Sequence, residues 1–129
     1  MKITKKEIEA TSKLQAVARY QYFMTRVAGT EKMYSLVDEG GDWAICCMGE
    51  RTLFSVWSAP EYAEACAQSE WKGFAVKEIT IEDLENDIVD EIDVYGHLIN
   101  VFSVKDRSGF IVDYNEFARD LIDELRKFH

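Results

Sequence analysis

Three cysteines and two histidines are the side chains with which this sequence could perform nucleophilic or metal chemistry. Cys46 and Cys47 are adjacent, and neighbouring residues of a strand point to opposite faces, so the pair is poorly placed to chelate one ion. No C-x-x-C occurs, and His97 and His129 lack the close spacing of a zinc-binding pair. A catalytic thiol would need Cys46 or Cys66 beside His97 together with positive charge, which is scarce in this acidic chain. We therefore predict free thiols, no metal, no cofactor and no catalysis through cysteine.

A run of carboxylates, EDLENDIVDEID at residues 82–93, is the most conspicuous charged feature. A calcium loop would need a central glycine, and the run has none. Helical periodicity places four of its acidic side chains outward or at the edges of a helix: Glu82, Glu85, Asp90 and Asp93. The run is typical of a solvated helix face, and the alternative is an acidic docking surface for a basic partner.

Composition restricts the classes of partner. The chain has 129 residues, 24 acidic against 15 basic side chains, and a formal net charge of −9. That charge argues against nucleic acid and anionic membranes as partners, and it leaves basic proteins open. With 47% hydrophobic residues, a chain of this length is expected to form one domain with its own core. Without a signal peptide or a long apolar run, we expect a cytoplasmic location.

The stretch VWSAPEYAEACAQSEW, residues 56–71, is the part of the sequence that most resembles a site. Ser58 and Glu61 have capping-box spacing, and the intervening proline suits a first helical turn. The pattern predicts that a strand ends at Trp57 and a helix begins at once, with Tyr62 and Cys66 facing a sheet. The alternative is a ligand pocket on a mixed sheet face, lined by Cys46, Trp57, Tyr62 and Trp71.

The N-terminal segment predicts a helix from the capping box at Thr4 to Ala28, with an interruption near residues 11–12 and Gly29 as its C-terminal glycine. Its second half is apolar on more than one face. The main stripe consists of Val17, Tyr20, Met24 and Val27. A stripe so broad indicates packing on two sides or a contact between chains.

The remaining pattern predicts strands and helices in the order α-βββ-α-β-α-ββ-α. Gly49 is the first residue of a two-residue loop, which favours a type II′ hairpin turn at residues 49–50 with Met48 paired to Arg51. Thr80 and Asp113 have the spacing of helix caps. We predict an α+β fold with a mixed, mostly antiparallel sheet on which the helices pack.

With these segments in place, the sequence resembles a small bacterial family known as domain-of-unknown-function family 2750. The pieces that carry the resemblance are YQYFMTRVA, GGDWAI, VWSAPEYAEACAQSEW and DYNEFARDLIDEL, so it extends from about residue 14 to the end. Its most specific pattern is formed by Trp57, Tyr62, Ala63, Cys66, Glu70 and Trp71. The arrangement is similar, more distantly, to the N-terminal domain of serine-sensitivity-enhancing proteins.

The resemblance implies no activity, cofactor or catalytic residue. By analogy of fold alone, some small acidic α+β proteins act as immunity or accessory proteins beside secreted toxins. The leading hypothesis is a non-catalytic module that binds another protein through its surface. The alternatives are a small enzyme or ligand-binding domain with the pocket named above, and a structural homodimer formed through the first helix.

Overall fold

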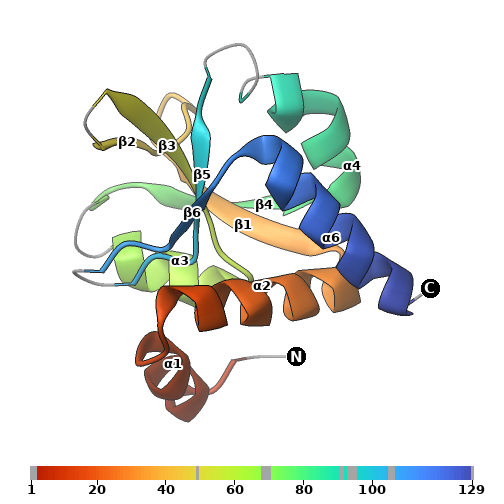
Figure 1. The fold of residues 1–129 in the computed structure, drawn as a ribbon. Helices are drawn as coiled ribbons and strands as arrows, with labels where there is room; N and C mark the ends of the chain where they lie inside the picture. Colours follow the sequence, from red (N-terminus) through yellow and green to blue (C-terminus); the bar gives the residue numbers. More distant parts are fainter. Residues whose placement is uncertain are drawn as a thin grey trace.

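The computed structural model describes residues 3–48, 50–67, 71–90, 92, 96–104 and 107–128. The fold is α+β, as predicted, and the elements follow the expected order (Figure 1). They are α1 (Lys5–Ser12), α2 (Ala16–Thr30), β1 (Lys32–Val37), β2 (Ile45–Met48), β3 (Arg51–Val56), α3 (Pro60–Ala67), β4 (Ala75–Thr80), α4 (Ile81–Asp83) with the π-helical turn η1 (Leu84–Ile88), β5 (Leu98–Val101), β6 (Phe110–Val112) and α6 (Tyr114–Phe128). No helix in the described ranges is both long and apolar enough to cross a membrane.

Three of the predicted helix starts are confirmed. The Thr4 hydroxyl accepts a hydrogen bond from the backbone N–H of Glu7 at 3.1 Å, which caps α1. Thr80 and Asp83 form a reciprocal capping box at the start of α4. The Asp113 carboxylate accepts a backbone N–H from the first turn of α6 at 2.8 Å. Each cap satisfies amide groups that have no partner inside the helix.

The capping box predicted at Ser58 and Glu61 is wrong. Helix α3 begins at Pro60, and the buried Ser58 hydroxyl has no hydrogen-bond partner among the described residues. Glu61 does not close the cap because its carboxylate accepts the backbone N–H of Ile3 at 3.1 Å. A tertiary contact with the N-terminal segment thus replaces the local one.

The N-terminal helical segment forms two helices, α1 and α2, separated at residues 13–15. The prediction that Gly29 ends the second helix is wrong. Helix α2 continues to Thr30, and Glu31 adopts the left-handed conformation with φ of 60°, its N–H bonded to Val27 O at 2.7 Å. Glycine or asparagine is usual at a left-handed position after a helix. The presence of Gly29 therefore predicted the helix end two residues too early.

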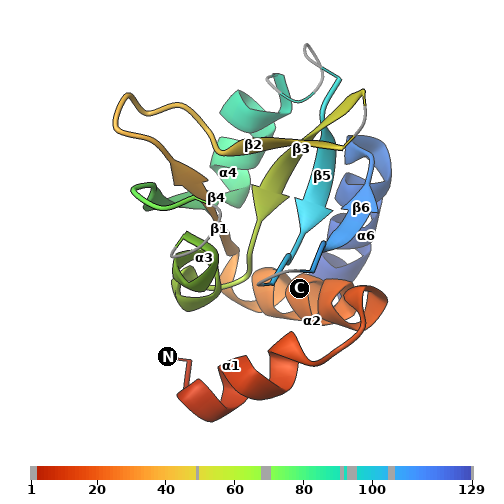
Figure 2. The same ribbon diagram turned by 90° about the vertical axis from the view of Figure 1, so that its left-hand side faces the viewer.

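The main sheet has the strand order β2-β3-β5-β6 and is mixed (Figure 2). The predicted β2–β3 register is confirmed, with Met48 opposite Arg51. Strands β3 and β5 are parallel, with α3, β4 and α4 between them in the sequence, and β6 is antiparallel to β5. Strand β1 pairs with β4, and single bridges from Tyr34 to Trp57 and from Val37 to Trp43 join this ribbon to the main sheet.

Helices cover the main sheet unequally. Helices α4 and α6 lie on one side, α3 lies on the other, and α2 crosses one end (Figures 1 and 2). The side chains between α2, α6 and the sheet form much of the core and are almost fully buried: Phe23, Val27, Phe54, Ile99, Val101, Val112 and Phe117. The segment that begins with α4 contributes Leu84 and Ile88 of η1 and, after it, Ile92.

The opposite face of the sheet contains buried polar groups that bond to one another. The Ser35 hydroxyl donates to Ser55 O at 2.6 Å, and the Asn100 amide donates to the Ser55 hydroxyl at 3.4 Å. The Asn100 carbonyl accepts the backbone N–H of Gly109 at 2.9 Å. Buried polar groups need such partners, and here they bring Gly109 against β5.

Candidate functional site

The aromatic stretch at residues 56–71 is mainly part of the core. Trp57 is 0% exposed, and its indole N–H donates to Ser103 O at 2.8 Å. Its ring meets that of Trp71 edge to face, with centroids 5.9 Å apart. The Cys66 thiol donates to the same Ser103 carbonyl at 3.3 Å. The strand-to-helix corner predicted from the sequence therefore binds the backbone at Ser103 through both Trp57 and Cys66.

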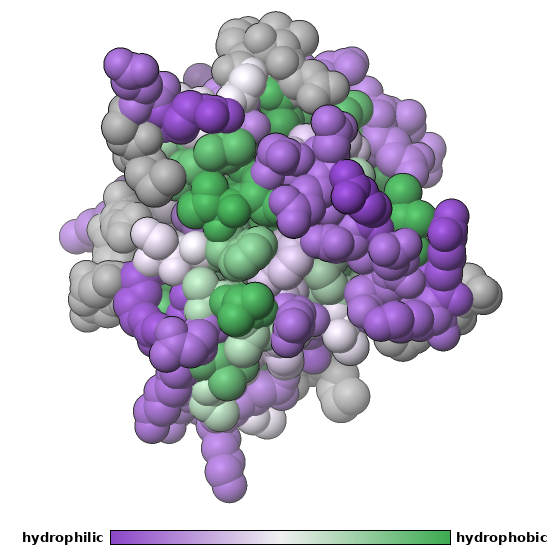
Figure 3. Space-filling view, in the orientation of Figure 1, coloured by the Kyte–Doolittle hydropathy of each residue, from purple (hydrophilic) through white to green (hydrophobic). Residues whose placement is uncertain are grey.

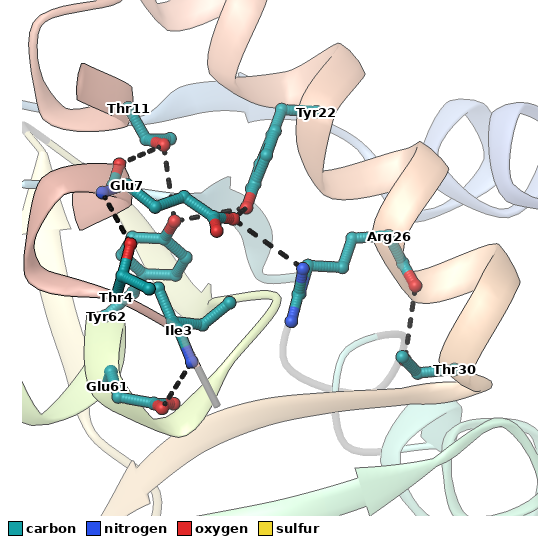
Figure 4. A network of polar contacts seen from close by, with 9 residues as sticks. All are labelled: Ile3, Thr4, Glu7, Thr11, Tyr22, Arg26, Thr30, Glu61 and Tyr62. Carbon is teal, nitrogen blue, oxygen red and sulfur yellow. Dashed lines mark hydrogen bonds and ion pairs between the residues drawn. The ribbon is translucent and has the colours of Figure 1, made fainter. Parts of the chain in front are cut away.

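Tyr62 lies in a polar network that fastens α1 to the rest of the fold (Figure 4). Its hydroxyl donates to the Thr11 hydroxyl at 3.2 Å and lies 3.1 Å from that of Tyr22. The Tyr22 hydroxyl in turn donates to the Glu7 carboxylate, and Arg26 approaches the same carboxylate at 3.7 Å. Helices α1, α2 and α3 are thus joined through side chains.

The four residues proposed as a pocket are not gathered around one of the clefts described below. Trp57, Tyr62 and Trp71 are buried, and Cys46 is half-buried on β2. Of the four, Tyr62 lines a cleft formed by described residues between α1 and α3. This α1/α3 cleft has a volume of about 170 Å³, and its walls include Ile8, Ser12, Tyr62, Cys66, Ser103 and Arg107.

A larger groove lies between α2 and α6, with a volume of about 500 Å³. Four apolar or aromatic lining residues, Val17, Tyr20, Met24 and Phe110, are here called its floor, and Gln21, Thr25 and Lys127 also line the groove. Four carboxylates line its walls: Glu116, Asp120, Asp123 and Glu124. In the space-filling view, a band of hydrophobic surface runs over β6 and α2 and is bordered by the hydrophilic surface of α6 (Figure 3). We call this feature the α2/α6 groove.

Tyr20 connects the floor of the groove to its wall. Its ring packs on that of Phe110 with centroids 4.5 Å apart, and its hydroxyl donates to the Asp120 carboxylate at 2.5 Å. Burial raises the pKa of Tyr20 above its usual value, and the hydrogen bond to Asp120 raises it further. Burial also raises the pKa of Tyr22, with a second contribution from its hydrogen bond to Glu7. Both phenols are held in their protonated form.

We expect these two phenols to make the fold sensitive to alkali. Their pKa values are higher in the folded chain than the value of about 10 for an exposed tyrosine. Their contribution to stability is therefore complete below about pH 10 and is lost as the pH rises above it. The midpoint of urea unfolding should fall above about pH 10. The Tyr20→Phe/Tyr22→Phe double variant should show a shallower fall, and an equal slope would contradict the assignment.

The apolar stripe predicted as a self-contact is largely covered by the chain itself. Of its four residues only Val17 is exposed, at 51%, whereas Tyr20, Met24 and Val27 are buried. Helix α2 packs against α6 and the sheet at once, which explains its breadth. Tyr20 and Met24 still reach the floor of the α2/α6 groove. Of the four stripe residues, Val17 is therefore the most accessible to a partner at this surface.

The described part of the acidic run lies on α4, η1 and the helical residues 89, 90 and 92 that follow. Glu82, Glu85 and Asp90 are exposed, and Asp93 lies outside the described residues. No ion pair found among the described residues involves these three carboxylates. Within that same set of residues, no cluster of histidine, cysteine and acidic side chains is arranged to hold a metal ion.

Two features of these sites were missed in the sequence. Phe110 and Asp120 complete the α2/α6 groove, but they are far from α2 in the chain and only the fold brings them there. Arg19 is fully buried, and the signal for it was a charged residue within an otherwise apolar helical stretch. A charged side chain buried in a core needs hydrogen-bonding or oppositely charged groups around it.

Comparison with protein families decides the relationship. The family described as "Protein of unknown function (DUF2750)" matches residues 20–121. The chain belongs to the DUF2750 family. The match confirms the family inferred from the aromatic pattern, over a somewhat shorter range. In this DUF2750 protein, α1 and the first turn of α2 precede the matched range, so Ile8, Ser12 and Val17 lie outside it. No curated protein matches the chain in sequence.

Proposed function

We propose that the protein is a non-catalytic binding module that takes a basic, amphipathic segment of a partner protein into the α2/α6 groove. The observation that supports this is the combination of an apolar floor with walls that bear four carboxylates. A flat acidic surface would attract cations without holding their apolar parts. A purely apolar groove would not distinguish basic partners from others.

The chemistry of lysine and arginine fits this combination. Both have an aliphatic stem and a charged end, and the stem can lie on apolar surface while the charge remains in a polar environment. The stems would rest on Val17, Met24 and Phe110, and the charges would reach Glu116 and Asp123. Lys127 already pairs with Glu124 at 2.8 Å on the same wall, as an incoming cation would.

The net charge of −9 would speed the encounter with a basic partner. Exposed charges are screened by salt, so the rate of association should fall as the ionic strength rises. This role agrees with the accessory or immunity-like function considered from the sequence. The proposed contact surface is now on α6, where charge and apolar surface occur together, and no longer on the acidic run of α4.

The test uses a fluorescent amphipathic helical peptide of leucine, alanine and lysine, and fluorescence anisotropy. We expect saturable binding that the Glu116→Lys/Asp123→Lys variant weakens by about tenfold, since each exposed pair contributes up to about 1 kcal/mol. The matched control is Glu85→Lys/Asp90→Lys, which makes the same change of net charge on the acidic run. If both variants weaken binding equally, the peptide responds to net charge and the groove is not the site.

A second variant separates groove binding from simple attraction. Val17→Asp makes the chain more acidic but removes an exposed apolar side chain from the floor. Attraction alone would strengthen the binding of a cationic peptide, whereas docking in the groove requires that it weaken. Sedimentation of the protein without peptide tests the rival occupant, a second copy of this chain. A dimer that Val17→Asp dissociates would favour the homodimer instead.

A further inference from the structure

Arg19 is a buried cation without a described anionic partner. It is 0% exposed on α2, and its two terminal nitrogens donate to Leu14 O at 3.1 Å and to Ser108 O at 2.8 Å. Its Nε has no hydrogen-bond partner among the described residues, and none of the ion pairs found within them includes it. Burying a charge is costly unless an opposite charge is near. A bound anion close to Arg19 would therefore offset part of this cost.

A second guanidinium belongs to the segment that Arg19 contacts. Arg107 precedes Ser108, to which Arg19 is bonded, and its own Nη1 donates to Ser12 O at 3.3 Å. Burial lowers the pKa of Arg19 from its usual value, and the positive charge of Arg107 lowers it further. Arg19 and Arg107 thus bring two positive charges to the segment at residues 107 and 108.

Arg107 opens onto the α1/α3 cleft. The volume of about 170 Å³ is far more than one water molecule needs, and Tyr62 and Cys66 are among the residues that line it. An oxyanion there could accept charge-assisted hydrogen bonds from the exposed Arg107 side chain. Arg19, which donates to the carbonyl of Ser108 next to Arg107, would lie behind it.

We propose that the α1/α3 cleft binds a small oxyanion, a carboxylate or phosphate group, with Arg107 in direct contact and Arg19 as a buried charge behind it. This site is separate from the α2/α6 groove and does not depend on the function proposed for that groove. The competing explanation is structural: Arg19 only ties the connection between α1 and α2 to the segment at Ser108.

The experiment titrates the full chain with inorganic phosphate and, separately, with acetate, at an ionic strength kept constant with chloride. Amide and arginine Nε–H resonances are followed by NMR. We expect saturable shifts at residues 103, 104, 107 and 108 and at the Arg19 Nε–H. Binding to Arg107→Gln should be at least about tenfold weaker, as expected when charge-assisted bonds are lost. The control is Arg51→Gln, the same loss of charge at an exposed position on β3.

Saturation by either anion supports the site, and the preferred anion identifies the group it accepts. If Arg107→Gln melts much earlier than the wild type, Arg107→Lys provides the second variant. It retains the charge without the planar fork and should bind more weakly than the wild type but more strongly than the glutamine variant. If neither anion gives saturable shifts at millimolar concentration, or if Arg107→Gln binds as well as Arg51→Gln, the proposal is wrong.

Discussion

Replacing Tyr62 with alanine is expected to lower the free energy of unfolding by about 4 kcal/mol, the usual cost of truncating a buried aromatic side chain. Tyr62 is 3% exposed, and its ring packs on that of Phe102 with centroids 4.5 Å apart. The substitution would leave a cavity between α1, α2 and α3 and remove the hydrogen bond to Thr11. Urea unfolding followed by circular dichroism measures the change.

Tyr62→Phe is the matched control because it removes only the hydroxyl. Its expected cost is about 1 kcal/mol, the net contribution of a typical hydrogen bond. A protein that tolerates Tyr62→Ala without loss of stability would show that this ring is not part of the core. The aromatic stretch would then return to the candidate binding sites.

The second large effect is expected at Gly109. A Cβ at this position would lie 2.3 Å from Val101 O and 2.7 Å from the side-chain oxygen of Asn100. The nearest atom belongs to the backbone of β5, which cannot move without disturbing its pairing with β6. We expect Gly109→Ala to cost about 3 kcal/mol or more, at the upper end of the range for overpacking.

Comparing the melting temperatures of Gly109→Ala and Gly40→Ala measures the effect of the close contact at Gly109. At Gly40 a Cβ meets only the Asp38 carboxylate, at an ordinary 3.4 Å. A change at such a surface position should stay within about 0.5 kcal/mol. Equal melting temperatures for the two variants would contradict the tight contact at Gly109.

The parts of the fold that could be predicted depend on neighbours in the sequence. The caps at Thr4, Thr80 and Asp113 each use a residue three positions on, and the β2–β3 register follows from a short turn. The outward placement of Glu82, Glu85 and Asp90 follows from the helical period alone. In each case the structure depends on residues close together in the chain. The types and spacing of those residues are therefore enough to predict it.

The predictions that failed are those in which a distant partner replaced a local one. The Glu61 carboxylate accepts the backbone N–H of Ile3 and does not cap its own helix. The α2/α6 groove depends on Tyr20 meeting Phe110 and Asp120, which no local pattern indicates. The candidate surfaces therefore changed: the apolar stripe is mostly internal, and α6 supplies the carboxylates that lie beside apolar surface.

The parallel pairing of β3 with β5 has a consequence for the order in which a newly made chain can fold. Strand β3 leaves the ribosome well before β5, because α3, β4 and α4 are synthesised between them. Until then the edge of β3 away from β2 has unpaired amide and carbonyl groups, which are a template for pairing with another chain. Closing so long a segment is entropically costly, which slows sheets with distant pairings. The nascent β2–β3 hairpin is therefore the stage of synthesis at which this protein is most exposed to aggregation.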